Sequence, residues 1–163
     1  MADDLAQEDF RHALAHWVSG VVAVSTEVEG LAHATTVSSF ASVSMSPPLI
    51  LICLQSRSRL LTLIESRGLF AVSLLSERQA DVSKTFSGRD RPVDVGFGEV
   101  PIVRLPSGLP AVADASAHLD CVLHDQSVQG DHHICIGRVT GVMSAPDGGP
   151  LVYFKRAYRS LSL

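Results

Sequence analysis

The sequence predicts a mainly β fold, a small, partly closed antiparallel β-barrel with a few short flanking helices. Six or so strand patterns are joined by connections that hold only short helical patterns. No regular alternation of strands and helices is present to build a doubly wound parallel sheet. The chain of 163 residues, 46% of them hydrophobic, has the length for one domain over residues 1–163 with a substantial core.

The first half of the chain opens with a helical pattern and continues with strand patterns. Phe10, Leu14 and Trp17 recur at i, i+4 and i+7 after acidic residues, which predicts an amphipathic helix that packs across the sheet. Strand patterns follow at 21–26, 31–37 and 49–54. The last of these is apolar throughout, as is typical of a strand buried on both faces.

The second half contains two short helices and further strands. A helix over 58–67 is expected to stop at Gly68, and Ser76–Gln79 has the spacing of a capping box that opens a helix towards Phe86. Residues 88–110 lack periodicity, which predicts a long surface excursion. The strand patterns of this half are 70–75, 117–123, 134–143 and 151–154. The second of them alternates polar with apolar residues, which indicates one face in water.

The stretch from Thr35 to Ser44 is rich in hydroxyl side chains. Closely spaced hydroxyls offer hydrogen-bond donors without a formal charge, which suits a phosphate-bearing ligand that lies along the backbone. A half-buried edge strand has a similar composition, because β-branched residues pack well on a pleated surface. Both interpretations stay open from this segment alone.

Charge, cysteine content and motifs exclude several classes of protein. The net charge is −4 and the basic residues are scattered, so nucleic acid is not expected as a partner. No apolar run approaches the ~20 residues that a membrane helix needs. Three cysteines without CxxC spacing, and a start without a signal-peptide pattern, lead us to expect a cytoplasmic protein. Pro101 replaces the third glycine of a dinucleotide fingerprint, and Walker and GxSxG motifs are absent.

Histidines are the candidate metal ligands and proton carriers. His12 and His16 are spaced to grip a metal but lack a third ligand, so a solvated helix face is expected and no metal site is predicted. Solvated positions on the polar face of a strand are also expected for His118 and His124. His132 and His133 follow a tight turn, and strand alternation directs one ring inward and the other outward.

Five blocks in a fixed order give the chain a family resemblance. They are FRHALAHWVSGVVAVST, TTVSSFASVSMSPPLILICL, GLFAVSLLSERQADVSKTF, GDHHICIGRV and PLVYFKRAYRSL. In this order they resemble the flavin reductase family with an FMN-binding split-barrel fold, whose small members supply reduced flavin to two-component monooxygenases. The resemblance covers nearly the whole chain and implies an antiparallel, Greek-key-like split β-barrel.

The resemblance also implies a set of cofactor-binding residues. They are Thr36, Val37, Ser38, Ser39, Ser42, Ser44, Cys53, Leu54, Gln55, Ser58, Phe86, Ser87, Gly88, His132, Tyr158 and Arg159. Residues 36–39 would line the isoalloxazine ring and ribityl chain, and Ser58 would meet the phosphate at a helix N-terminus. His132 would be a positioning residue at the nicotinamide side of the pocket. Tyr158 would either close over the cofactors or plug the barrel.

The implied activity is reduction of FMN or FAD by NADH or NADPH, with hydride transfer from nicotinamide C4 to flavin N5. No obligatory acid or base is expected, because the protein supplies positioning and exclusion of side reactions. The implied partners are a second copy of the chain in a homodimer and a flavin-dependent monooxygenase that receives diffusing reduced flavin. The alternative is a flavin- or haem-binding split barrel that carries electrons or stores cofactor. The block Gly130–His132 favours the reductase.

Three places depart from the family's pattern. Ala34 stands where glycine is common, and its methyl group is expected to narrow the pocket or to alter flavin preference. Arg138 replaces a commonly acidic residue. Lys155–Ala157 lacks the glycine that often precedes the tyrosine, which is expected to reshape the nicotinamide lid.

Overall fold

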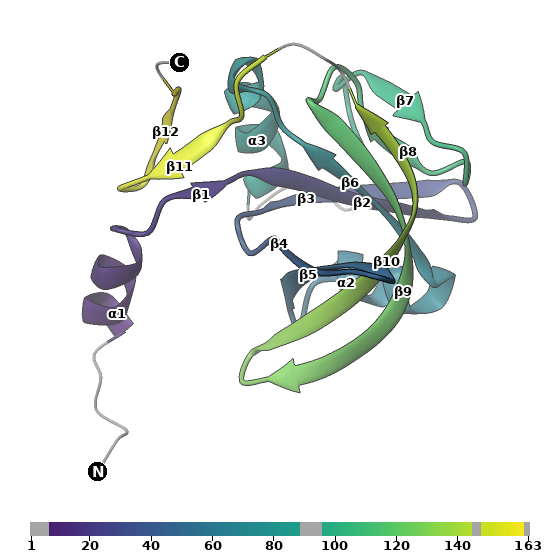
Figure 1. Ribbon diagram of the computed structural model, residues 1–163, viewed down its shortest axis with the longest axis horizontal. Coiled ribbons are helices and arrows are strands. Elements are labelled where there is room, and N and C mark those ends of the chain that lie inside the picture. The colour runs from purple at the N-terminus through teal and green to yellow at the C-terminus, as the bar shows by residue number, and fades with distance from the viewer. Residues whose placement is uncertain (1–6, 89–95, 145–147, 162–163) are drawn as a thin grey trace.

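The computed structural model describes residues 7–88, 96–144 and 148–161. Its main element is a seven-stranded antiparallel sheet (Figure 1). The strands are β2 (Val22–Val28), β3 (Leu31–Val37), β4 (Ala41–Met45), β5 (Pro48–Gln55), β6 (Leu69–Leu74), β9 (Ala117–Gln129) and β10 (His132–Ser144). They are hydrogen-bonded in the order β3-β2-β6-β9-β10-β5-β4.

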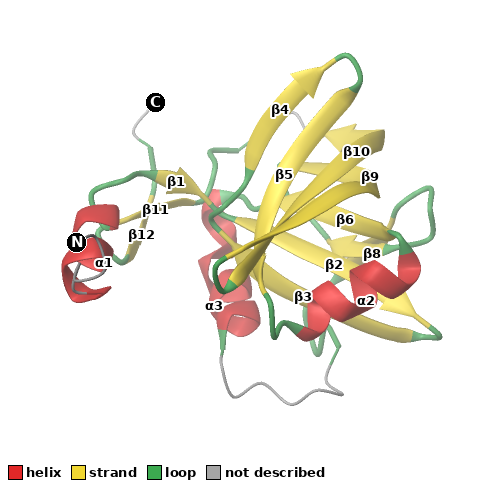
Figure 2. Cartoon of the chain, turned by 90° about the horizontal axis from the view of Figure 1, so that it is seen from below, coloured by secondary structure: helices red, strands yellow, loops and turns green. Residues whose placement is uncertain are grey.

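The sheet curls into a barrel that is left open at one seam. Its two edges are β3 and β4, yet only residues 38–40 separate these strands in the chain. Edges joined by so short a link lie close together at that end, so the sheet is strongly curved (Figure 2). The predicted partly closed antiparallel barrel is therefore confirmed.

A helix closes one side of the barrel. In α2 (Arg59–Arg67), Leu60 and Ile64 are fully buried and pack in the core with Phe70 and Ile52. The helix ends where the sequence predicts, because Gly68 takes a left-handed φ of 71° and its N–H donates to the Ile64 carbonyl at 2.7 Å.

The second predicted helix is also confirmed. The Gln79 side chain accepts a hydrogen bond from the Ser76 N–H at 3.0 Å, as in a capping box. A short 3₁₀ turn, η1 (Glu77–Gln79), follows this cap and leads into α3 (Ala80–Ser87). Phe86, near the end of α3, is buried, and its ring meets the Phe97 ring edge to face with the two centroids 5.4 Å apart.

Gly137 allows the long β9–β10 hairpin to wrap closely round the core. A Cβ atom at this position would collide with the ring of Phe70, which is fully buried. The pairing of β9 with β10 shifts register beside Gly137 and again before Gly141. Such bulges bend and twist a strand pair, which gives the hairpin its curvature.

The N-terminal helix differs from the prediction. α1 (Gln7–Leu14) buries none of its residues, and Trp17 just beyond it is 76% exposed. Instead of crossing the sheet, α1 stands beside a small sheet of β1 (Ser19–Gly20), β11 (Val152–Phe154) and β12 (Ala157–Arg159) (Figures 1 and 2). We call α1 and this small sheet the arm.

The strand at 117–123 was expected to have one face in water, and this prediction is wrong for two of its polar residues. His118 and Asp120 are buried, because a hairpin of β7 (Ile102–Arg104) and β8 (Pro110–Val112) covers them. His118 Nε2 lies 2.7 Å from the Val112 carbonyl, and Asp120 Oδ2 accepts a hydrogen bond from the Ser107 N–H at 2.9 Å. Part of the predicted excursion at 88–110 is therefore ordered cover for the sheet, while residues 89–95 lie outside the described part.

β5 also differs in detail from the expected doubly buried strand. Ile50, Ile52 and Leu54 are buried, whereas the residues between them, Leu51 and Cys53, are only half-buried. One face of β5 thus belongs to the core and the other is open to the site described below.

Candidate functional site

An open groove of about 1030 Å³ lies at the seam of the barrel. It lies between the β3–β4 link, the end of β5, the start of α2, the end of α3 and the tip of the β9–β10 hairpin. Its lining residues are Thr35, Thr36, Val37, Ser38, Ser39, Cys53, Leu54, Gln55, Ser58, Phe86, Ser87, Gly88, Gln129, His132 and Ile134. A groove of this size accepts a ligand as large as a dinucleotide.

Hydroxyl groups along one wall are tied to the backbone of neighbouring elements. Thr35 and Thr36 on β3 donate to the carbonyls of Phe86 and Ser83 in α3, each at 3.4 Å. Ser39 donates to the Cys53 carbonyl and accepts from the Cys53 N–H, at 3.1 Å each. These bonds fix the wall in place, so its geometry is set before any ligand arrives.

Three polar side chains form a row across the floor of the groove. β10 pairs with β5 and β9 so that His132 lies between Gln55 and Gln129. Directly paired residues send their side chains to the same face of a sheet. Two positions along, Ile134 and Cys53 are paired on that face. The floor of the groove is thus polar at Gln55, His132 and Gln129 and apolar two residues further along the strands, at Cys53 and Ile134.

The N-terminus of α2 opens into the groove. Ser58 is the N-cap residue, with extended backbone angles (φ −70°, ψ 126°) and no hydrogen bond from its side chain to its own helix. The first N–H groups of a helix have no acceptor within it, and they carry a partial positive charge. Ser58 and these amides are suited to an anion, such as a phosphate group.

The two adjacent histidines point to opposite faces, as predicted. His132 lines the groove and its Nδ1 forms a hydrogen bond with Asp131 Oδ1 at 2.7 Å. The hydrogen bond and charge of His132 lower the pKa of the Asp131 carboxyl below its ordinary value. The His133 ring lies on the far face, where its Nδ1 is 4.0 Å from Glu65 Oε1 of α2.

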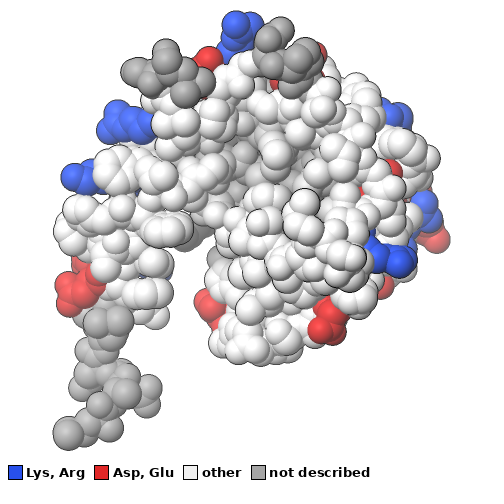
Figure 3. All heavy atoms as spheres, viewed as in Figure 1, with Lys and Arg blue, Asp and Glu red and all other residues white. Residues whose placement is uncertain are grey.

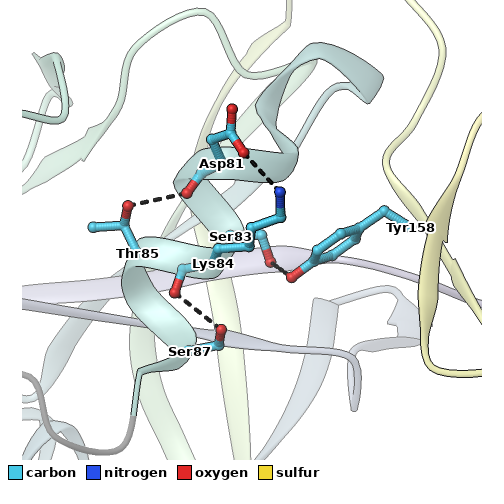
Figure 4. A network of polar contacts seen from close by, with 6 residues as sticks. All are labelled: Asp81, Ser83, Lys84, Thr85, Ser87 and Tyr158. Atoms are coloured by element: carbon cyan, nitrogen blue, oxygen red, sulfur yellow. Dashed lines mark hydrogen bonds and ion pairs between the residues drawn. The ribbon is translucent and has the colours of Figure 1, made fainter.

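Tyr158 lies beside α3 rather than in the groove. Its hydroxyl is 2.8 Å from the Ser83 Oγ, within a set of contacts that runs along α3 (Figure 4). Its ring meets the Tyr153 ring at 5.4 Å. Tyr158 thus links the arm to α3 outside the groove lining, and its predicted role toward the cofactors stays a prediction. Arg159 is exposed and lies outside the groove lining.

Most of the residues that the sequence assigns to cofactor binding line this one groove, although they come from five separate elements. Besides Tyr158 and Arg159, Ser42 and Ser44 are outside it. The pairing of β4 with β5 shifts register between these two serines, and the Ser44 hydroxyl accepts the Ser46 N–H at 3.3 Å. The hydroxyl-rich stretch therefore serves the groove only up to Ser39.

The sequence assignment omitted three groove residues, Thr35, Gln129 and Ile134. Thr35 belongs to the hydroxyl-rich stretch and could have been included on composition. Gln129 and Ile134 enter the site through strand pairing with His132 and Cys53, which no local pattern reveals. Ala34 does not face the groove: it is buried with Phe86 and Phe97, so the expected narrowing by its methyl group is wrong.

The three cysteines fall into two environments. Cys121 and Cys135 are fully buried, and burial raises the pKa of their thiols to about 12 and about 11. Cys53 is half-buried and lines the groove. Only Cys53 is thus placed to meet a ligand.

The described residues contain no group of three His, Cys, Asp or Glu side chains arranged to hold a metal ion. The His12 and His16 rings meet edge to face, with their centroids 5.5 Å apart. None of the helices in the described part of the chain is long and apolar enough to cross a membrane.

Fold and site together define a split-barrel protein with a hydroxyl-lined groove into which the N-terminus of a helix opens. Comparison with known families gives the particular family: residues 14–162 match the flavin reductase like domain, and the chain belongs to this family.

Similar proteins cover almost the whole chain. The reductase component of 4-hydroxyphenylacetate 3-monooxygenase from Thermus thermophilus is 38% identical over 155 residues, which span 95% of this chain and 97% of that protein. An NADH-dependent flavin reductase from a Rhodococcus species is 35% identical over 94% of this chain and 85% of its own length. Among solved structures, the NADH:FAD oxidoreductase SgcE6 of Streptomyces globisporus superposes with a TM-score of 0.92, at 30% identity, over 100% of this chain and 98% of that one.

Proposed function

We propose that this chain is a flavin reductase, which reduces FMN or FAD with NADH or NADPH in the groove and releases reduced flavin to a partner monooxygenase. The observation that carries the proposal is the convergence of the family's flavin-binding blocks on one groove of sufficient volume. The relatives named as reductases with NADH, and as a monooxygenase reductase component, support it.

The groove residues fit a flavin. Residues 36–39, at the end of β3 and in the connection to β4, offer backbone and hydroxyl groups along the edge of the planar isoalloxazine ring. Ser58 and the N-terminus of α2 would hold the phosphate, since the serine hydroxyl is not used by its own helix. Ser87 and Gly88 at the end of α3 also line the groove. Cys53 and Ile134 supply the apolar surface against which an aromatic ring packs.

The protein's contribution to the reaction is positioning. When both are bound, the nicotinamide and the flavin supply the redox chemistry, a hydride passing from C4 of one ring to N5 of the other. His132, flanked by Gln55 and Gln129, would orient the nicotinamide side, and Asp131 would hold the imidazole in one orientation through the 2.7 Å hydrogen bond. No side chain has to gain or lose a proton for the transfer.

We further propose that the protein is a homodimer. β4 is an edge strand, and edge strands left open are prone to pair with other chains. Val43 and Met45 on β4 are 47% and 89% exposed, and Phe10 on α1 is 51% exposed. Covering these side chains with a second copy would remove apolar surface from water. Light scattering on the purified chain should give twice the monomer mass, and a monomer mass would contradict the dimer.

An anaerobic assay tests the reductase proposal. Purified protein is mixed with FMN or FAD, NADH or NADPH is added, and the oxidised-flavin absorbance is followed. Catalytic bleaching is expected, and the rates with the four combinations rank the cofactors. Flavin binding without bleaching would contradict the reductase and favour a carrier or storage protein.

A further inference from the structure

A second cavity of about 500 Å³ lies between α1 and the β11–β12 turn, in the arm. We call it the basic pocket. Its walls include Arg11, Lys155 and Arg156, with the aromatic rings of Trp17 and Tyr153, and it shares Ser38 with the groove. The space-filling view shows the notch that separates the arm from the barrel (Figure 3). The groove and the basic pocket therefore adjoin at Ser38.

The cationic groups of the basic pocket are available to an anion. Within the described ranges, none of Arg11, Lys155 and Arg156 forms an ion pair with a carboxylate. Glu8 and Asp9, in the first turn of α1, are the nearest acidic residues in sequence, and neither is paired with Arg11. Arginine side chains bind phosphate through paired N–H groups, and lysine adds a point charge. The Lys155 ammonium lies over the Phe154 ring, 5.5 Å from its centroid, a contact that leaves its positive charge without a carboxylate partner among the described residues. Three cations around one cavity thus point to a phosphorylated ligand.

The turn that carries two of these cations has an unusual backbone. Phe154 pairs with Ala157, so Lys155 and Arg156 are the two central residues of the turn, with φ values of 49° and 59°. Asn and Gly are favoured at such positions, because longer side chains are strained there. The Lys155 N–H donates to the Ala15 carbonyl at 3.0 Å, which holds the turn against α1. Strained residues that are held in place concentrate where a protein grips a ligand.

Trp17 completes the chemistry of the pocket. Its indole is 76% exposed although it is the largest side chain that lines the pocket. A flat aromatic ring beside cationic groups is the usual platform for a nucleobase, which stacks on the ring while its phosphates meet the charges.

We infer that the basic pocket binds the phosphorylated adenosine end of a dinucleotide whose redox ring lies in the groove. The inference rests on the proposed function, which places flavin and nicotinamide in that groove. FAD and NAD(P)H share this adenosine chemistry, so either could supply it. FMN lacks an adenosine and would leave the pocket without a ligand.

The direct test uses ADP-ribose, which carries the adenosine and its phosphates but no redox ring. Trp17 is the only tryptophan of the chain and lines the basic pocket, so its fluorescence reports on a ligand bound beside it. Titration of the wild-type protein should quench the fluorescence to saturation. The double variant Arg11→Gln/Arg156→Gln should weaken the binding about fivefold, as expected for two exposed charge contacts. The control Arg138→Gln changes an exposed arginine on β10 and should leave the affinity unchanged.

This titration needs no flavin and no turnover, so it can succeed or fail independently of the reductase assay. No tryptophan response to millimolar ADP-ribose, or equal affinity in the double variant and the wild type, would overturn the inference. Two further arms then identify the source. A higher FAD dissociation constant with unchanged FMN affinity in the double variant assigns the pocket to FAD. A higher KM for NADH, but not for reduced nicotinamide mononucleotide, assigns it to the pyridine nucleotide.

Discussion

The groove and the basic pocket meet at Ser38 but are built in opposite ways. The groove wall consists of uncharged groups, and Thr35, Thr36 and Ser39 are bonded to the backbone of other elements. The basic pocket consists of exposed charges that are unpaired within the described part of the chain. A wall that is held in place positions a rigid ring, whereas free cations hold a flexible phosphate without fixing it closely. We therefore propose that the groove sets the reaction geometry and that the basic pocket contributes to the choice of cofactor.

The largest effect on stability is expected from truncating Phe86, a side chain that lines the groove and also packs in the core. Phe86→Ala deletes a ring that packs on Phe97 at 5.4 Å, and should lower the free energy of unfolding by about 3–5 kcal/mol. Urea denaturation measures this loss. Trp17→Leu, in the basic pocket, is the matched aromatic control and should change stability by no more than about 0.5 kcal/mol. Equal losses in the two variants would contradict the distinction between a packed wall and an open pocket.

Blocking the groove chemically should have the next largest effect. Cys121 and Cys135 are buried with thiol pKa values of about 12 and about 11, so at pH 8 they stay protonated and inaccessible. A bulky maleimide should therefore label Cys53 alone and abolish flavin binding. Mass spectrometry locates the label, and bound FMN should protect the thiol. Labelling of Cys53 that leaves the FMN dissociation constant unchanged would show that the flavin is elsewhere.

The phosphate end of the groove is tested by one hydroxyl. Ser58→Ala should raise the FMN dissociation constant about tenfold, the effect of losing one hydrogen bond to a charged group. Stability should be unchanged, because the Ser58 side chain makes no cap bond in its own helix. Fluorescence titration with FMN gives the constant. Ser42→Ala is the control outside the groove, and an increase there equal to that of Ser58→Ala would sink the placement.

The smallest effect is expected at the nicotinamide side. His132→Ala removes one partly exposed side chain of the polar row and should raise the KM for NADH about three- to tenfold, with FMN affinity retained. Steady-state kinetics measure the first quantity and a flavin titration the second. His124→Ala, exposed further along β9, should leave both unchanged. Wild-type NADH kinetics in His132→Ala would exclude His132 as a positioning residue.

Local patterns predicted the elements better than the contacts between them. The capping box at Ser76, the glycine stop at Gly68 and the barrel itself follow from short-range rules, and all are confirmed. The amphipathic pattern of α1 shows that one face is apolar but not what covers it, and the helix lies away from the sheet. His118 was expected in water because its polarity carries no information about the distant β7–β8 hairpin that buries it.

The site shows the same limit. The hydroxyl-rich stretch correctly indicated the groove wall up to Ser39, but the register shift in β4 takes Ser42 and Ser44 out of it. Gln129 reaches the floor only because β9 pairs with β10, so its place depends on strand register. Pairing between strands that are distant in the sequence, rather than residue type, therefore decides which of these residues line the groove.

The most direct test of the account is a crystal structure of the protein with oxidised FMN. We predict an isoalloxazine ring along residues 36–39 above Cys53 and Ile134, with the phosphate at Ser58 and the N-terminus of α2. The basic pocket should stay free of the ligand. An FMN bound in the basic pocket, or with its phosphate remote from α2, would contradict the assignment of the groove as the site of flavin reduction.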